Sequence, residues 1–363
     1  MRRALGTIGL GLLLVLVAGL FDVASLYVPG VAFAALCLLA AAWVRSAASR
    51  ASVTRELDVR SAVEGDPVPA RLIVHAGLRL PTATIMDPLL DEPLALPSGS
   101  GSRELHASVR FARRGRRPLE PPSLVLRDPL RLARRVVPGS GTHELLVLPR
   151  ISEIAVASRG SDAGRSGGAA ALLSATASEI DGLRPYREGT PAARIHWQTL
   201  ARGGGLMERR LRSDGDARPL VVLDARTPES EEALDAAVRA TASLCDAFAR
   251  SGGCALLLPG ERRATTIGED LAAWPGAHVR LALVEGEAGT PAPAMGAVGV
   301  RRGPLLYVAA RAIDRLPPST RTAARGSSTL VVPGELPGRE PTFTVAGCSG
   351  YAMARRSVEV EAA

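Results

Sequence analysis

The sequence predicts a membrane hairpin of two helices, then a β-sandwich-like domain, then an α/β domain built on a doubly wound sheet. Three observations lead to this prediction. Two apolar runs fill most of the first 48 residues. Residues 49–152 alternate apolar and polar side chains with a period of two, as half-buried antiparallel strands do. From residue 217 onward, short continuous apolar runs alternate with helical or loop segments, which is typical of strands covered on both faces.

The N-terminal apolar runs occupy residues 4–21 and 23–44, and only Asp22 separates them. A helix of about 20 residues crosses a bilayer core, so two transmembrane helices joined by a tight turn are expected in residues 1–48. Two arginines precede the first run, Arg45 and Arg50 follow the second, and the turn has no positive charge. The positive-inside rule then predicts a multi-pass protein of the cell membrane with both termini cytoplasmic. The rival interpretation is a signal peptide, but no clear A-x-A cleavage site follows.

Two stretches give the clearest strand signal in the predicted β-sandwich-like domain, residues 49–152. Their apolar positions alternate with polar ones: Val68, Ala70, Leu72 and Val74 in the first, and Leu105, Ala107, Val109 and Phe111 in the second. Turn signals such as EGDP and PSGSGS separate the strands, and no amphipathic helix intervenes. Antiparallel sheets are therefore expected. Residues 153–178 are rich in Gly, Ser and Ala, which predicts a flexible linker.

The α/β domain is expected over residues 217–345. Its first apolar run ends at Asp224, and Thr227 and Pro228 are suited to begin a helix after it. Apolar residues then recur at helical spacing until SGG ends the pattern: Leu234, Val238, Leu244, Cys245 and Phe248. Further apolar runs at 254–260, 277–286, 303–311 and 328–336 continue the alternation, whereas residues 288–302 are ambiguous. Residues 346–363 are expected to be a C-terminal tail.

Composition limits the classes of function. The chain has 363 residues, a hydrophobic content of 47% and a formal net charge of +8, so it can bury a sizeable core. All 44 basic residues are arginine, and they form no stripe interleaved with aromatic side chains. Nucleic acid is therefore not an expected partner. The four cysteines show no CxxC pair and no metal-ligand spacing with histidine, which predicts buried thiols in a reducing compartment.

The most distinctive text is GLRPYREGTPAARIHWQTLAR, residues 182–202, within a motif region of residues 179–216. It resembles the DUF58 family of bacterial membrane proteins. The matching positions are Gly182, Arg184, Tyr186, Gly189, Arg194, Ile195, His196, Trp197, Ala201 and Arg202. Thr190 and Gln198 stand where that family usually has Asp and Lys. The layout is also similar up to about residue 260: a membrane hairpin, a β-rich domain ending in a phrase like LRDPLRLARR, the motif, and then a von Willebrand A-like domain.

The resemblance implies partners as well as a fold. DUF58 proteins usually accompany a MoxR-type AAA+ ATPase, often with a transglutaminase-like membrane protein. A von Willebrand A-like domain is an interaction module, so the implied fold and the implied partners agree. The expected surroundings of this chain are thus a lipid bilayer and a MoxR-type AAA+ ATPase.

Asp224 stands at the position of a degenerate metal site, where the metal-binding pattern of A-like domains is incomplete. The metal-binding form of the A-like domain holds its ion with D-x-S-x-S, because a carboxylate and two hydroxyls are hard oxygen ligands. Here Ala225, Arg226, Thr227 and Pro228 follow Asp224, so both serine positions are lost. A guanidinium at position 226 competes with any cation near Asp224. We therefore expect no bound metal and an Asp224 that pairs with Arg226 or caps a neighbouring turn.

The motif residues have three possible roles: catalysis, binding and packing. His196 with Asp181 or Glu188 supplies acid and base types, but the chain has no H-E-x-x-H and no G-x-S-x-G elbow between a predicted strand and a helix, so no catalytic residue is assigned. The motif arginines are suited to grip phosphates or carboxylates of a partner. The structural alternative is that they form internal ion pairs while Tyr186 and Trp197 pack a domain junction, and we expect this one.

The sequence therefore favours a membrane-anchored cytoplasmic adaptor or scaffold without enzymatic activity and without a cofactor. It would work with a MoxR-type AAA+ ATPase in protein complex assembly or maturation. One alternative is a hydrolase or ligand-binding enzyme that uses the region from Asp181 to Arg202. Another is a purely structural membrane protein.

Overall fold

A computed structural model of the chain describes residues 2–90, 92–140, 143–156, 183–185, 197–201, 203, 205–209, 218–287, 289–298, 303–323 and 327–353. The chain forms two compact units. The first comprises Met1–Ala112 and Arg116–Val147, and the second comprises Arg113–Gly115 and Leu148–Ala363. The helices at the N-terminus thus belong to the same unit as the first β-sheets.

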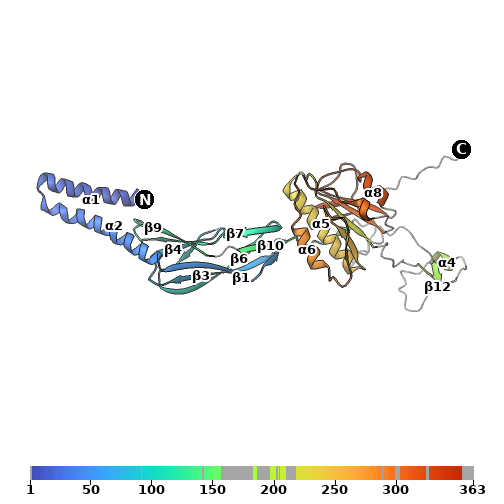
Figure 1. The fold of residues 1–363 in the computed structure, drawn as a ribbon, viewed down its shortest axis with the longest axis horizontal. Helices are drawn as coiled ribbons and strands as arrows, with labels where there is room; N and C mark the ends of the chain where they lie inside the picture. Colours follow the sequence, from blue (N-terminus) through green and yellow to red (C-terminus); the bar gives the residue numbers. More distant parts are fainter. Residues whose placement is uncertain are drawn as a thin grey trace. The chain divides into compact units, whose positions relative to one another are not determined.

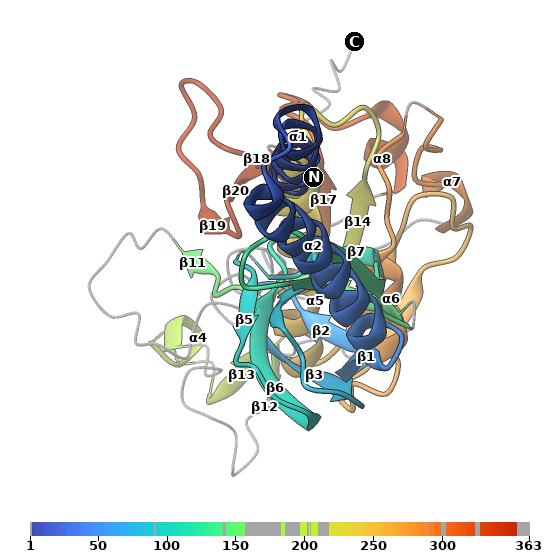
Figure 2. The same ribbon diagram turned by 90° about the vertical axis from the view of Figure 1, so that its left-hand side faces the viewer.

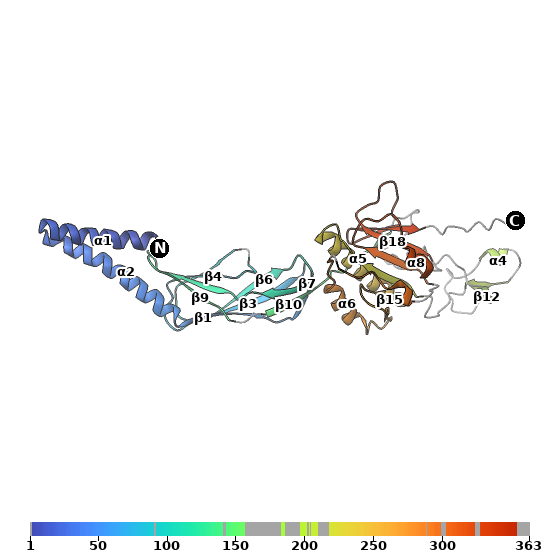
Figure 3. The same ribbon diagram turned by 45° about the horizontal axis from the view of Figure 1, so that its top comes forward.

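The first unit begins with two helices, α1 (Arg2–Phe21) and α2 (Tyr27–Ala48), which run antiparallel and side by side (Figures 1 and 3). The chain reverses at Asp22, which has a φ of 52°, and passes through a short 3₁₀ helix, η1 (Ala24–Leu26). The helices approach closely at Gly30, where an added Cβ would lie 2.6 Å from a methyl group of Val15. The predicted hairpin is therefore present.

One helical stretch in the described part of the chain, Ala24–Ala48, is long and apolar enough to cross a membrane. The apolar part of α1, Leu5–Phe21, is shorter. At about 1.5 Å per residue it covers about 25 Å, somewhat less than a hydrocarbon core of about 30 Å. Most large apolar side chains of both helices point outward, among them Leu12, Leu16, Val28, Leu38 and Leu39.

The rest of the first unit is three sheets with the strand orders β1-β3-β6, β2-β10-β7 and β5-β4-β8-β9, and the strands of the first and third sheets pair antiparallel. The strands are β1 (Ala51–Leu57), β2 (Ser61–Val63), β3 (Pro67–Ala76), β4 (Thr82–Met86), β5 (Leu94–Leu96), β6 (Gly101–Arg110), β7 (Gly115–Leu119), β8 (Ser123–Arg127), β9 (Arg134–Pro138) and β10 (His143–Leu148). The predicted alternation is confirmed in β3, whose four even-numbered positions from Val68 to Val74 are all buried.

Two of these sheets share one apolar core. Leu72 and Val74 of β3 face the same cluster as Ile85 of β4 and Leu124 of β8. Val44 and Ala47, in the last turns of α2, are buried in it too. Because the end of α2 is part of this core, the helix and the sheets are joined by packing as well as by the chain.

An Asp-Pro-Leu turn follows each of two neighbouring strands of the first unit, β4 and β8. Asp87 follows β4 and accepts a hydrogen bond from the Leu89 amide at 3.0 Å, and Asp128 follows β8 and accepts one from the Leu130 amide at 3.0 Å. Asp87 is also bonded to the buried guanidinium of Arg55, with Nη1 to Oδ1 at 2.7 Å. The LRDPLRLARR phrase of the sequence therefore forms the β8–β9 hairpin.

The main sheet of the second unit has the strand order β11-β19-β20-β18-β17-β14-β15-β16. The order from β18 to β11 is visible at the left of Figure 2. Its strands are β11 (Ala155–Val156), β14 (Leu220–Asp224), β15 (Cys254–Leu257), β16 (Thr265–Ile267), β17 (Leu305–Ala309), β18 (Ser328–Pro333), β19 (Phe343–Val345) and β20 (Cys348–Met353). The four central strands, β18, β17, β14 and β15, pair in parallel, and the outer strands pair antiparallel.

Helices cover both faces of this sheet. One apolar cluster joins one face of the sheet to α5 (Glu231–Arg250) and α6 (Trp274–Ala282). The other cluster includes Met295 of α7 (Met295–Val298) and Leu316, which precedes α8 (Pro318–Ala323). α7 and α8 lie side by side (Figure 2). A parallel sheet with both faces covered explains the continuous apolar runs of the sequence.

A separate small element of the second unit pairs β12 (Leu183–Pro185) with β13 (Met207–Arg209), and the short helix α4 (Trp197–Ala201) lies between them in sequence. These are the described parts of the DUF58-like motif region. Residues 157–182, 186–196 and 210–217 lie outside the described residues, so the predicted linker after residue 156 stays a prediction.

Four local expectations differ from the structure. Ser230, not Thr227, caps α5, because its hydroxyl accepts from the Ala233 amide at 3.0 Å. The run at 277–286 lies largely in α6, where Ala277 and Leu281 share a buried face. Part of the predicted linker, Ala155–Val156, is a strand paired with β19. Most of the described part of the predicted tail is β20, paired with β18 and β19.

Candidate functional site

The candidate site is the edge of the main sheet at which the parallel strands end. β14 lies between β15 and β17, and the chain runs from β14 through α5 to β15 on one side, then crosses to β17 on the other. Such a switch point, beyond the carboxyl ends of the strands, is where open α/β sheets usually bind ligands. Asp224 is the last residue of β14 and therefore stands at this point.

Asp224 is buried and both of its carboxylate oxygens are occupied. Arg226 donates from Nε to Oδ1 and from Nη2 to Oδ2, each at 2.8 Å, and its backbone amide donates to Oδ1 at 3.2 Å. Tyr307, from the middle of β17, donates its hydroxyl to Oδ2 at 2.6 Å. The pairing of Asp224 with Arg226 that the sequence predicts is thus present, and it has the two-pronged geometry that makes guanidinium–carboxylate contacts strong.

The contacts fix the charge states of this cluster at neutral pH. Burial alone raises the pKa of the Asp224 carboxyl, but hydrogen bonds from Arg226 and Tyr307 outweigh it and hold that pKa below its usual value. The hydrogen bond to Asp224 raises the pKa of the Arg226 guanidinium. Burial and the bond to Asp224 raise the pKa of the Tyr307 hydroxyl. Asp224 is therefore a carboxylate, Arg226 a cation and Tyr307 a neutral donor.

Hydrogen bonds join two loops at this edge of the sheet. Thr227 has a φ of 42°, and its hydroxyl accepts a hydrogen bond from the Arg311 guanidinium in the loop after β17. Glu229 accepts from the Ala312 amide at 2.8 Å. These bonds connect the β14–α5 loop to the β17–α8 loop. They hold the two loops in fixed positions at the edge of the sheet where Asp224 lies.

This arrangement does not fit a divalent cation. The carboxylate oxygens that a cation would use are filled by a guanidinium and a phenol, and Arg226 and Pro228, at the two serine positions, have no oxygen ligand in their side chains. Among the described residues, no group of three or more His, Cys, Asp or Glu is placed to hold a metal ion. Arg226 supplies the positive charge at this position, with 30% of its side chain exposed.

Tyr307 and Arg311 are the site residues that sequence reasoning missed. Tyr307 is the one aromatic residue in the apolar strand LLYVA, and a phenol in such a strand usually needs a buried partner. That signal was present in the sequence. The contact of Arg311 with Thr227 joins residues 84 positions apart and gave no local signal.

The motif residues are only partly described. Arg184 lies in β12, and its backbone pairs with Glu208 of β13. Trp197 begins α4 and is 56% exposed, so none of the described residues buries its ring, and its packing at a domain junction stays a prediction. A five-residue helix has too little surface to bury an indole ring by itself. Tyr186, Gly189, Arg194, His196 and Arg202 lie outside the described residues, and so does Asp181, which the enzymatic alternative needs.

The cysteines are buried thiols, as the sequence predicts. Burial raises the pKa of the Cys348 thiol to about 12 and that of Cys245 well above its ordinary value. Cys254 lies next to Cys245 and donates to its carbonyl oxygen at 3.5 Å. Because the thiolate is the reactive form, Cys245 and Cys348 are unsuited to nucleophilic chemistry at neutral pH.

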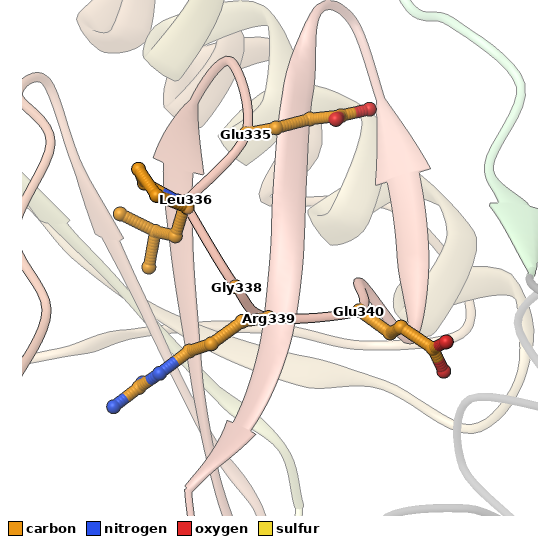
Figure 4. A pocket seen from close by; sticks show the side chains of 6 residues that line it. Glu335, Leu336, Gly338, Arg339 and Glu340 are labelled. Carbon is orange, nitrogen blue, oxygen red and sulfur yellow. The ribbon is translucent and has the colours of Figure 1, made fainter.

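The described cavities lie away from Asp224. One of about 460 Å³ is lined by six consecutive residues of the β18–β19 loop, from Glu335 to Glu340. In Figure 4, Leu336 and Arg339 point to one side of this loop and Glu335 and Glu340 to the other. A second, of about 330 Å³, lies by β11, β19 and the start of β20. Neither contains a predicted site residue, and a hollow formed by one loop does not enclose a substrate.

Comparison with known proteins gives no family for this chain. No protein-family model matches it, and no curated protein matches it.

Proposed function

We propose that this chain is a membrane-anchored cytoplasmic adaptor or scaffold without enzymatic activity. In this proposal it is a DUF58 protein, its second unit is von Willebrand A-like, and its partner is a MoxR-type AAA+ ATPase, with a transglutaminase-like membrane protein as a further candidate. The complex would act in the assembly or maturation of other proteins. The hairpin α1–α2 would cross the membrane twice and leave both termini in the cytoplasm.

The observation that supports an adaptor over an enzyme is the closed cluster at Asp224. At the switch point of an open sheet, an enzyme needs a group that can take a ligand, a metal or a proton. Asp224 already accepts two guanidinium bonds and a phenol bond, and the loops above it are braced. A rigid surface with fixed charges is suited to recognising another protein, for which preorganisation lowers the cost of binding.

The observation that supports membrane anchoring is the outward-facing apolar surface of α1 and α2. Leucines and valines cover the outside of both helices, while small residues such as Gly11 and Gly30 meet between them. Lipid-facing helices are apolar outside and closely packed at small residues inside. This pattern favours a membrane hairpin over a helix pair in the core of a soluble protein.

The experiment is co-purification of the full chain with a purified MoxR-type ATPase from the same cell. The chain is held in mild detergent and the ATPase is added with a non-hydrolysable nucleotide. We expect binding, and we expect it to persist in EDTA once the effect of Mg²⁺ on the nucleotide itself is controlled, because no ion at Asp224 takes part. Absence of binding with every nucleotide state tested would contradict the proposal.

A matched pair of variants tests whether the carboxyl edge of the sheet is the binding surface. Arg262 and Arg263 are exposed in the loop after β15, at the same edge as Asp224. Arg218 and Arg250 are exposed at the opposite edge. Arg262→Gln with Arg263→Gln should weaken ATPase binding, and Arg218→Gln with Arg250→Gln, which removes the same charge, should not. Equal effects of the two pairs would exclude this edge as the specific surface.

A further inference from the structure

A cluster of exposed arginines lies at the end of the first unit from which the apolar hairpin emerges. The last turns of α2 pack into the β core through Val44 and Ala47, and α2 contacts β9 (Figure 1). Trp43 also donates from its ring nitrogen to the carbonyl oxygen of Arg79 at 3.4 Å. This end of the sheets therefore packs against the last turns of α2, where Arg45 follows the long apolar run.

The strand register places three loops at this same end. Ala51 of β1 pairs with Ala76 of β3, and Ala76 pairs with Gly101 of β6. In the other sheet Thr82 pairs with Arg127, and Arg127 pairs with Arg134. The β3–β4 loop, the β5–β6 loop and the β8–β9 turn thus gather around the start of β1 and the end of α2.

Positive charge dominates this end. We define the arginine collar as the seven exposed arginines on these segments: Arg45, Arg50, Arg79, Arg127, Arg131, Arg134 and Arg135. Within the described part of the chain, none of the seven forms an ion pair. The corresponding segments, residues 43–51, 76–82, 97–103 and 126–135, contain a single acidic residue, Asp128. Asp128 is buried and accepts hydrogen bonds from turn amides, so it does not neutralise the collar.

The β8–β9 pair places two arginines side by side, which is unfavourable unless an anion that is not part of the protein binds to them. Arg127 and Arg134 are directly opposite each other on neighbouring strands. Like charges at such positions destabilise a sheet. Beside them, Leu130 is 54% exposed and Val136 is 45% exposed. Cations together with exposed apolar side chains are the composition that enters the headgroup region of a membrane.

We propose that the arginine collar binds the headgroups of anionic lipids, with Leu130 in the membrane interface. This inference rests on the membrane placement of the hairpin in the proposed function. The position of the collar favours lipid over nucleic acid, because α2 would bring these arginines to the headgroup layer. Residues 126–138 also contain no aromatic side chain on which a base would stack. The collar would fix the depth and tilt of the first unit at the membrane surface.

The test uses the full chain in nanodiscs of phosphatidylcholine with phosphatidylglycerol as the minor component. Lipids that stay bound after gentle extraction are counted by native mass spectrometry. We expect enrichment of phosphatidylglycerol over its share in the disc. The variant Arg131→Gln with Arg134→Gln and Arg135→Gln should lower that enrichment by about tenfold or more, given the attraction of each basic residue to an anionic surface.

A matched variant removes three exposed arginines from the opposite end of the first unit. Arg60, Arg110 and Arg116 lie there, away from α2. Changing these three to Gln should leave the enrichment at the level of the unaltered chain. Thermal unfolding checks that both triple variants fold, which is expected because all six side chains are exposed.

Five outcomes would overturn the inference. The collar variant could keep the enrichment, or both triple variants could lose it equally, and either result would exclude a specific lipid surface at the collar. Release of the lipid by millimolar inorganic phosphate would assign the collar to a small anion. Tighter binding of a short single-stranded RNA than of phosphatidylglycerol would assign it to nucleic acid. Failure of the unaltered chain to stay in the nanodisc would instead contradict the membrane placement, and this inference with it.

Discussion

Arg226 gives Asp224 a partner that is part of the chain and occupies the carboxylate oxygens that a metal ion would use. A buried carboxylate needs compensation for its lost hydration. Here the compensation comes from the guanidinium of Arg226 and the hydroxyl of Tyr307. The pairing with Arg226 was predictable because the two residues are neighbours in sequence. Tyr307 comes from another strand, and only the parallel register of β14 and β17 brings it there.

The first prediction concerns the stability of this cluster. Asp224→Asn should lower the free energy of unfolding by roughly 2 to 3 kcal/mol, because it leaves a partly buried guanidinium without its anion. Tyr307→Phe should cost about 1 kcal/mol, since it removes one hydrogen bond and keeps the ring. Thermal unfolding of the full chain in detergent measures both. A larger loss in Tyr307→Phe than in Asp224→Asn would contradict the assigned order of the contacts.

The second prediction concerns metal binding at the same residue. Calorimetry should detect no saturable Mg²⁺ or Mn²⁺ binding that depends on Asp224, because its oxygens are occupied. Arg226→Ser together with Pro228→Ser removes the competing cation and adds two hydroxyls, so this variant should gain binding. Micromolar binding to the unaltered chain that disappears in Asp224→Ala would contradict the account.

The third prediction concerns pH and His278. Its ring stacks on Trp274 with centroids 4.9 Å apart, and its Nε2 bonds to the carbonyl oxygen of Pro149 at 2.8 Å. Burial lowers the pKa of His278, and the bond to Pro149 opposes this only in part. The unfolded chain therefore takes up the proton first, so the contribution of this group to stability is complete above a pH of about 6.5 and falls as the pH drops toward the folded-state pKa.

Melting temperatures between about pH 7.5 and about pH 5.5 check this sign. The unaltered chain should lose stability over that interval, and His278→Gln should flatten the loss. An unchanged pH profile in the variant would mean that His278 is not the titrating group.

At the scale of elements, the sequence predicts those whose periodicity is local. In β3, apolar residues occupy every second position from Val68 to Val74, so the strand could be predicted from the sequence. In α5, apolar residues recur at helical spacing from Leu234 to Phe248, so the helix could be predicted as well. β20 was missed although β19, one of its two partners, ends only two residues before it in the chain. Gly350 stands opposite Phe343 of β19, where a Cβ would lie 2.3 Å from the ring. A glycine under an aromatic ring has no signature in sequence.

The fourth prediction concerns Trp197, whose ring is exposed on α4. Burial of Trp197 at a junction would make Trp197→Ala cost about 3 to 5 kcal/mol. With its ring exposed on α4, we expect a change within about 0.5 kcal/mol, as is usual for surface positions. Thermal unfolding decides between these values. Loss of ATPase binding in this variant with unchanged stability would place α4 in the partner surface.

At the scale of the whole molecule, the charges around the hairpin predict an orientation in the membrane. Arginines stand at both outer ends of the apolar segment, and the turn at Asp22 has none. The collar adds further arginines at the end of α2. Positive residues near membrane helices stay in the cytoplasm, which predicts that both units lie on that side. A cytoplasmic ATPase can reach the second unit only in this orientation.

The fifth prediction tests this orientation and with it the adaptor proposal. The measurement is a pair of reporter fusions after residue 50 and after residue 363, one reporter active only in the cytoplasm and the other active only outside it. The account predicts that at both positions the cytoplasmic reporter is active and the external one is silent. Activity of the external reporter at either position would contradict a cytoplasmic adaptor anchored by an N-terminal hairpin.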